Sequence, residues 1–312
     1  MIMATTKGIR MRLGFVGLGK MGAQIVTKLL AAGHEVVVTD INSDAVAAMA
    51  QAGATPAADR AELAALLPGP ATVWLMIPAD FVDAELNAFA ENLPAGSTII
   101  DGGNSDFRLT IQRSAKLAAK NITLIDVGTS GGILGFTNGF SMMVGGPDES
   151  VKAIKPILDT LSLPDGAHHH FGKSGSGHYV KMVHNVIEYG LMQAYAEGYQ
   201  LLAEGPIQPI DLAAAANVWQ HGSIITSGLG ELIADIYAQN PKFEGIEGFV
   251  AQSGEGLWTS EVAEAAGVPM PALAAALDTR KASEAGHTSH ATKLLAAMRN
   301  AFGGHSLNRG SK

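Results

Sequence analysis

The chain has 312 residues, of which 47% are hydrophobic and 16% charged, so it is long and apolar enough to bury a sizeable core. Its formal net charge of −8, without a basic stripe, argues against nucleic acid as a partner. The lack of cysteine excludes disulfides and thiolate metal sites. We expect a cytoplasmic protein without membrane contacts, because no apolar run reaches the roughly 20 residues of a membrane span and no export signal is visible.

Strand and helix patterns divide the chain into three parts. Residues 1–10 have no apolar segment and are expected to form a disordered leader. Residues 11–174 alternate between strand-like and helix-like segments, which predicts a Rossmann-like α/β domain with a doubly wound, mostly parallel sheet. Over residues 175–312 strand signals largely vanish and alanine-rich helical segments take over, so we expect an all-α domain for substrate binding and dimerisation.

A glycine-rich turn follows the first predicted strand, residues 11–16, and opens a helix over 23–32. In this G-x-G-x-x-G pattern Gly17 permits a tight turn, Gly19 lets the backbone approach a pyrophosphate, and Gly22 lets the helix pack on the strand. The next strand, 35–39, ends at Asp40, whose carboxylate suits the two ribose hydroxyls of NAD and would repel the 2′-phosphate of NADP. The sequence therefore predicts NAD, with contacts also from Leu18, Met21, Ile77 and Pro78.

The alternation continues along the first domain, with strands expected at 72–77, 98–100, 122–127 and 140–144 and helices at 43–51, 60–67, 81–91, 107–120 and 150–161. Ligands of such sheets bind outside the carboxyl ends of the strands. Asn104 and the run Ser130, Gly131 and Gly132 follow two of these strands. Each run by itself is equally typical of an ordinary turn.

Three consecutive histidines, His168 to His170, suggest a metal site at first sight. On an extended chain their side chains alternate between opposite faces, which is poor ligand geometry, and no nearby carboxylate pair supports such a site. We expect a loop leading into a strand, and no metal.

The second domain opens with a long helix over about 177–203 that carries Lys181, His184, Asn185 and Glu188 on one face. Together these groups are capable of acid/base chemistry, although a solvated polar face would look the same. An adjacent apolar stripe is expected to anchor this helix in a core; it consists of Val180, Val183, Ile187, Leu191 and Ala194. Further helices are expected at 209–220, 223–239, 260–266, 271–286 and 289–302.

Several of these motifs together resemble the decarboxylating 6-phosphogluconate dehydrogenases, within the β-hydroxyacid dehydrogenase superfamily. They are residues 17–22, 101–105, 130–132 and 177–190, with Trp258-Thr259, Arg280 and 299–305. The chain is similar to the short, often NAD-linked form of that family. The resemblance implies oxidation of the C3 hydroxyl of 6-phospho-D-gluconate and loss of CO2, giving D-ribulose 5-phosphate and NADH.

The resemblance also implies roles for the site residues. Lys181 would take the C3 hydroxyl proton and then stabilise the C3 oxygen, and Glu188 would protonate the enediol. Asn185, His184 and Asn104 would orient the C3 oxygen, the carboxylate or the nicotinamide. The remaining residues would hold the substrate: Ser130, Gly131 and Gly132 at its carboxylate, and Tyr189, Thr259, Arg280, Arg299 and His305 at its phosphate tail.

One departure from the family pattern concerns the tail. Leu257 stands where the family usually has a lysine or arginine, so a cation is lost there unless Lys281 or Arg309 compensates. A less charged substrate such as 6-deoxy-6-sulfogluconate is therefore an alternative.

Two further alternatives remain at this point. A non-decarboxylating 3-hydroxyacid dehydrogenase shares most of the N-terminal pattern, and a nucleotide-sensing protein without catalysis shares the Rossmann fingerprint. We also expect a homodimer or a higher even homo-oligomer, because the second half is alanine-rich and weakly charged. Arg299 and His305 are the candidates for completing a neighbouring subunit's site, and the resemblance implies this for His305 in particular.

Overall fold

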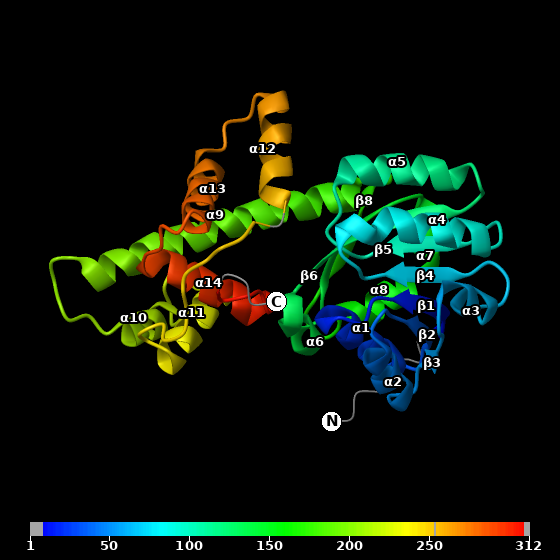
Figure 1. The fold of residues 1–312 in the computed structure, drawn as a ribbon, viewed down its shortest axis with the longest axis horizontal. Helices are drawn as coiled ribbons and strands as arrows, with labels where there is room; N and C mark the ends of the chain where they lie inside the picture. The colour runs from blue at the N-terminus through cyan, green and yellow to red at the C-terminus, as the bar shows by residue number, and fades with distance from the viewer. Residues whose placement is uncertain (1–8, 253, 309–312) are drawn as a thin grey trace. The chain divides into compact units, whose positions relative to one another are not determined.

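The computed structural model describes residues 9–252 and 254–308 (Figure 1). The chain forms two compact units, one up to Met182 and one from Val183 onward. Of the expected leader, only residues 9 and 10 lie within the described part, and they have no regular secondary structure. The predicted domain limits at 11–174 and 175–312 stay predictions.

The first unit is built on one sheet of eight strands in the order β3-β2-β1-β4-β5-β6-β7-β8. All neighbouring strands run parallel except β6 and β7. Their bounds are β1 Arg12–Val16, β2 Glu35–Thr39, β3 Thr55–Pro56, β4 Thr72–Leu75, β5 Thr98–Asp101, β6 Thr123–Ser130, β7 Ser141–Gly145 and β8 His168–Gly172. A mostly parallel α/β domain followed by a helical domain is confirmed.

Each face of this sheet has its own hydrophobic core. One core contains side chains of α1 (Lys20–Ala31) and α8 (Lys155–Ser162), including Ile25, Leu29 and Ile157. The other contains side chains of α3 (Arg60–Ala65), α4 (Val82–Asn92) and α5 (Phe107–Ala118), including Leu63 and Phe89. Burial on both faces explains why the strands read as nearly continuous apolar runs.

Two local features of the first unit differ from the sequence expectations, and a third, the strand formed by the histidine run, agrees with them. The helix expected over 150–161 is two helices, α7 (Asp148–Ala153) and α8, because Pro156 lacks an N–H and lies in the first turn of α8. The short strand β3 was not anticipated, since two residues carry no periodic signal. The histidine run forms β8, paired parallel to β7.

Helix α9 (Ser176–Glu204) begins in the first unit and continues into the second. The other helices of the second unit are α10 Leu212–Trp219, α11 Gly228–Gln239, α12 Glu255–Ala266, α13 Pro271–Glu284 and α14 His290–Gly303. No helix in the described chain has both the length and the apolar character that crossing a membrane requires.

The apolar stripe expected to anchor α9 was wrong for its second half. Ile187 and Leu191 are 59% and 50% exposed, and Ala194 is also exposed. Met192, Ala196 and Tyr199 are buried instead, and they pack with residues of α11 and α14. Hydrophobic periodicity found a helix here, but tertiary packing selected the neighbouring face.

Candidate active site

The glycine turn after β1 has the geometry that its sequence predicts. Gly17 has a φ of 96°, and a side chain there would place its Cβ 2.3 Å from the carbonyl oxygen of Met76. A Cβ on Gly22 would lie 2.0 Å from the carbonyl oxygen of Gly17. Both positions therefore require glycine, for conformation at the first and for close packing at the second.

Gly19 differs from these two because it faces open space, and a Cβ placed on it would have no other atom within 4 Å. It is the N-cap of α1, and no side chain caps that helix end. An uncapped helix N-terminus beside a concave turn without side chains suits a phosphate group. The residues present here fit the pyrophosphate of a dinucleotide.

Asp40 lies beside this turn, at the end of β2. One of its carboxylate oxygens accepts a hydrogen bond from the Leu18 N–H and the other accepts from the Asn42 N–H. These backbone donors fix the carboxylate in place, where its negative charge suits ribose hydroxyls. The Leu18 side chain itself is buried in the core and Met21 packs against that core, so what Leu18 offers this site is backbone.

The ends of β4 and β5 complete the edge of the sheet near the turn. Ile77 approaches Gly17, and its carbonyl oxygen lies 3.1 Å from a Cβ position on Gly103. Pro78 follows as the N-cap of a short 3-10 helix, Ala79–Phe81. Asn104 is exposed in the loop after β5, so it is available to a ligand.

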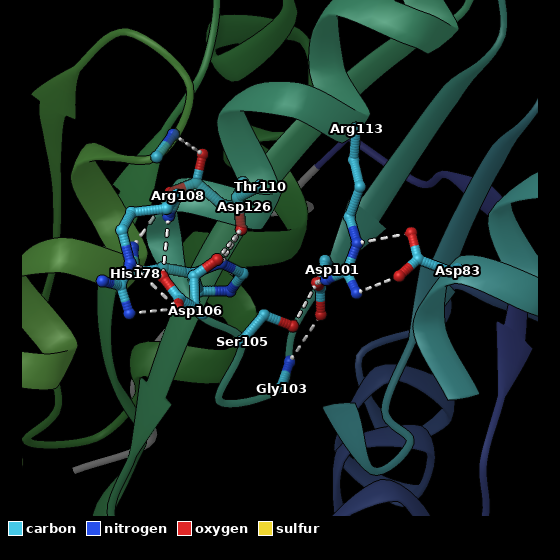
Figure 2. Close-up of polar contacts among 11 residues, drawn as sticks. Asp83, Asp101, Gly103, Ser105, Asp106, Arg108, Thr110, Arg113, Asp126 and His178 are labelled. Atoms are coloured by element: carbon cyan, nitrogen blue, oxygen red, sulfur yellow. Dashed lines mark hydrogen bonds and ion pairs between the residues drawn. The ribbon is translucent and has the colours of Figure 1, made fainter. Parts of the chain in front are cut away.

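Buried polar contacts fix the conformation of the loop after β5, which carries Asn104 (Figure 2). Asp101 accepts hydrogen bonds from the Gly103 N–H at 3.2 Å and from the Ser105 hydroxyl at 2.7 Å. Arg113, which is almost fully buried, lies 3.9 Å from Asp101 and makes a two-point ion pair with Asp83 at 2.9 and 2.8 Å. The arginine is the first cause of a lowered pKa at Asp83. These contacts position the loop that carries Asn104.

A second polar cluster fixes the start of α9 (Figure 2). The fully buried Asp126 of β6 accepts hydrogen bonds from the Gly175 N–H at 2.7 Å and the His178 N–H at 2.9 Å. The His178 ring is buried, and its Nδ1 lies 2.8 Å from the Thr110 hydroxyl. A carboxylate at a helix N-terminus satisfies its unpaired N–H groups and interacts well with its dipole.

Lys181 lies less than two turns beyond this anchor, with an exposure of 6%. A Cβ on Gly128 of β6 would come within 2.2 Å of the Lys181 Cβ. The glycine therefore lets the helix approach the strand closely and presses the lysine stem against it. The run Ser130-Gly131-Gly132 lies at the end of the same strand, where Gly131 and Gly132 have φ values of 119° and 52°.

Two buried arginines form the most unusual feature of the second unit. Arg280 is 1% and Arg299 6% exposed, and the guanidinium carbon of Arg280 lies 3.5 Å from the ring centre of Tyr189. Burial lowers the pKa of Arg280 to about 10 and lowers that of Arg299, while the negative charges of nearby Glu188 and Glu255 oppose this effect. Among the residues that the structure describes, no carboxylate makes an ion pair with either arginine. Two buried cations without such partners indicate a site for an anion.

The same unit brings Asn185 to the N-terminal turn of α12. The Asn185 Nδ2 donates to the Glu255 Oε1 at 3.2 Å, and the Asn185 Oδ1 lies 3.1 Å from the His184 Nδ1. Thr259 is buried, and its hydroxyl donates to the Glu255 carbonyl at 2.8 Å. Gly256 lets this turn approach the Tyr189 ring, with a Cβ position 3.1 Å from it.

Other predicted site residues lie at the margin of this cluster or outside it. Glu188 is half-buried and contributes to the electrostatics of Arg280. His305 is exposed after α14, where it contacts the Phe302 ring and its carbonyl accepts from Asn300. Leu257 is 47% exposed. Arg309 lies outside the described residues.

Sequence reasoning missed three buried polar residues: Asp126, His178 and Glu255. Asp126 carried a signal, because a carboxylate inside an otherwise apolar strand needs a partner. Glu255 carried none, since it was expected in a loop before a helix that in fact begins there. Within the described ranges no cluster of His, Asp or Glu has the arrangement of a metal site.

Both units of the chain match protein-family models. Residues 12–168 match the family model of the NAD binding domain of 6-phosphogluconate dehydrogenase, and 177–293 match that of the 6-phosphogluconate dehydrogenase C-terminal domain. The chain is 42% identical to an NAD(+)-dependent, decarboxylating 6-phosphogluconate dehydrogenase of Haloferax volcanii, over 96% of this chain and 99% of that protein.

Longer relatives are also similar. A decarboxylating 6-phosphogluconate dehydrogenase of Haemophilus ducreyi is 34% identical over 86% of this chain but only 58% of its own length. The solved structure of Plasmodium falciparum 6-phosphogluconate dehydrogenase superposes with a TM-score of 0.78 at 27% identity, covering 96% of this chain and 67% of that one.

Proposed function

The chain belongs to the 6-phosphogluconate dehydrogenase family, in its short form, and on this premise we propose that it converts 6-phospho-D-gluconate and NAD to D-ribulose 5-phosphate, CO2 and NADH. The observation that carries the proposal is the pair of buried arginines, Arg280 and Arg299, against Tyr189. Such a pair is stabilised when an anion neutralises it. The phosphate tail of the substrate supplies that anion.

The glycine turn would hold NAD, with the N-terminus of α1 binding its pyrophosphate and Asp40 binding its adenosine ribose. When bound, this cofactor accepts a hydride from C3 of the substrate. Ile77, Pro78 and Asn104, at the neighbouring strand ends, would contact its nicotinamide end.

Lys181 is the general base that takes the proton of the C3 hydroxyl as C3 is oxidised. Its ammonium group then donates to the new C3 oxygen, so that the electrons of the breaking C1–C2 bond are stabilised as an enediol when CO2 leaves. Glu188, two turns along α9, protonates the carbon that lost CO2, while the hydroxyl on the former C3 returns its proton to Lys181, which completes the ketose. Asn185 and His184 orient the C3 oxygen, and Ser130, Gly131 and Gly132 bind the carboxylate.

The tail site has Arg280, Arg299, Tyr189 and Thr259 as its binding residues. Leu257 adds no charge there, and Arg280 and Arg299 are the buried cations of this site. Phosphogluconate is therefore bound by fewer cations than the family pattern provides, and the sulfonate analogue tests how much charge the site requires.

The direct test is turnover of purified protein with NAD or NADP and with 6-phosphogluconate, 6-deoxy-6-sulfogluconate, gluconate or 3-hydroxyisobutyrate. NADH absorbance and released CO2 are measured together. We expect the highest kcat/KM for phosphogluconate with NAD, and one CO2 for each NADH. NADH formation without CO2 would instead identify a non-decarboxylating 3-hydroxyacid dehydrogenase.

The assembly that we propose is a homodimer or a larger even oligomer, acting in the cytoplasm. Exposed apolar side chains of the second unit support an oligomer, among them Ile187, Leu191, Leu201 and Ile224. Light scattering of the purified protein measures the number of subunits.

A further inference from the structure

Glu255 is a buried carboxylate that the proposed reaction does not use. It has an exposure of 5% at the first turn of α12. Its Oε1 accepts from the Asn185 amide, whereas its Oε2 is buried and has no hydrogen-bond partner among the described residues. A buried carboxylate oxygen without a partner costs free energy, and packing alone gives no reason to retain it.

The chemistry of this carboxylate fixes the orientation of Asn185. An ionised carboxylate only accepts hydrogen bonds, so the Asn185 atom that faces it at 3.2 Å must be the NH2 nitrogen. The carbonyl oxygen of the same amide then points to the other side, toward His184. The order of donors and acceptors is thus determined by Glu255 and not by the amide itself.

The orientation of Asn185 in turn determines which nitrogen of the His184 ring carries a hydrogen. The Asn185 Oδ1 is an acceptor, so the His184 Nδ1 at 3.1 Å must carry a hydrogen. In the neutral ring the hydrogen is therefore on Nδ1, and Nε2 holds the lone pair. Which nitrogen is protonated decides whether the other end of the ring accepts or donates a hydrogen bond.

We propose that Glu255 is a positioning residue that acts through Asn185 to hold neutral His184 in its Nδ1–H form. This inference rests on the proposed function, in which Asn185 and His184 orient the reacting C3 oxygen. With the chain Glu255–Asn185–His184 in place, both side chains meet the substrate in one arrangement. Without it, the amide can rotate by half a turn and the ring can change tautomer.

Two substitutions of Glu255 separate this role from simple packing. Glu255→Gln keeps the shape but allows either end of its amide to face Asn185, and Glu255→Met keeps the volume without an acceptor. Glu264→Gln, on an exposed part of the same helix, is the matched control. Thermal unfolding shows whether each variant is folded.

The first readout is the tautomer of His184, from nitrogen-15 NMR of protein labelled at histidine, with the signal identified by its loss in His184→Asn. We expect Nδ1–H in the wild type and in Glu264→Gln, and a mixture or the Nε2–H form in both Glu255 variants. An Nε2–H ring in the wild type overturns the proposal, as does an unchanged tautomer in both variants. If neither variant folds, the wild-type tautomer decides.

The second readout is kinetic. We expect kcat for phosphogluconate to fall about tenfold in Glu255→Gln and about 100-fold in Glu255→Met, with KM changed much less. A loss confined to KM, or none at all, contradicts the positioning role. The NMR result does not depend on turnover, so a wild-type enzyme inactive on phosphogluconate would refute the proposed function and leave the tautomer measurement to decide on Glu255.

Discussion

At the scale of single residues, Lys181 is the clearest case of a side chain whose environment only the structure shows. Its position on a helix predicted an acid/base group, but a solvated face would have the same pattern. In the structure the lysine is 6% exposed and presses against Gly128. A lysine buried at the carboxyl end of a parallel sheet fits a catalytic base far better than a surface charge.

Replacing Lys181 by glutamine should remove the base without removing the cofactor site. We expect kcat to fall by about 10²- to 10⁴-fold, because that is the usual contribution of general base catalysis. NAD affinity, measured by calorimetry, should stay near the wild-type value. A variant that retains a tenth or more of the wild-type kcat would show that another group takes the proton.

Asp40 should determine the choice between the two cofactors. Asp40→Ala removes charge-assisted hydrogen bonds of about 1.5–3 kcal/mol, so kcat/KM for NAD should fall about 10- to 100-fold. NADP should lose much less, because the repulsion of its 2′-phosphate is removed as well. Asp44→Ala, an exposed carboxylate at the start of α2 (Ser43–Gln51), is the control and should leave the NAD/NADP ratio unchanged.

At the scale of elements, the arrangement depends on how closely α9 approaches β6. Asp126 anchors the helix N-terminus, and Gly128 leaves room for the Lys181 stem two residues later on the strand. The sequence shows the glycine and the helix but not that they touch. Close contact between elements distant in the chain is a tertiary property.

Gly128→Ala tests this contact. The new methyl group would overlap the Lys181 side chain, so we expect a loss of about 1–3 kcal/mol in the free energy of unfolding and a loss of kcat. Gly198→Ala, in α9 with nothing within 4 Å of its Cβ position, is the matched control and should be neutral or stabilising. Equal behaviour of the two variants in denaturant titrations and assays would contradict the packing argument.

Helix α14 contributes a pH-dependent contact to the second unit. The His290 Nε2 lies 2.8 Å from the Tyr237 hydroxyl, and burial lowers the pKa of His290. Because the unfolded chain binds this proton more readily, the free energy of unfolding should fall as the pH drops below about 6.5. His290→Gln should show a smaller fall than the wild type between about pH 7.5 and pH 5.5 in urea titrations. An identical fall in both proteins would mean that other groups cause it.

At the scale of the whole molecule, the proposed oligomer would allow residues of one subunit to complete the site of another. Arg299 lies with Arg280 and Tyr189 in one chain, whereas His305 is exposed beyond α14. We therefore expect His305, and not Arg299, to act across an interface.

Subunit mixing distinguishes the two residues. Lys181→Ala and His305→Ala chains, each inactive alone, should recover up to about a quarter of wild-type activity when unfolded and refolded together, since half of the dimers are mixed and each has one intact site. Lys181→Ala mixed with Arg299→Ala should recover none. Recovery in the second mixture, or none in the first, would reverse the assignment.

The sequence by itself determined the α/β and all-helical halves, the cofactor turn with Asp40, and the helix face that carries Lys181 and Glu188. These features depend on local patterns: glycine spacing, strand alternation and helical periodicity are properties of neighbouring residues. Only the tertiary structure decided that Ile187 and Leu191 are exposed, that Arg280 and Arg299 are buried in one unit, and that Glu255 faces Asn185. Burial and pairing bring together residues far apart in the chain, and no local pattern records which of them meet.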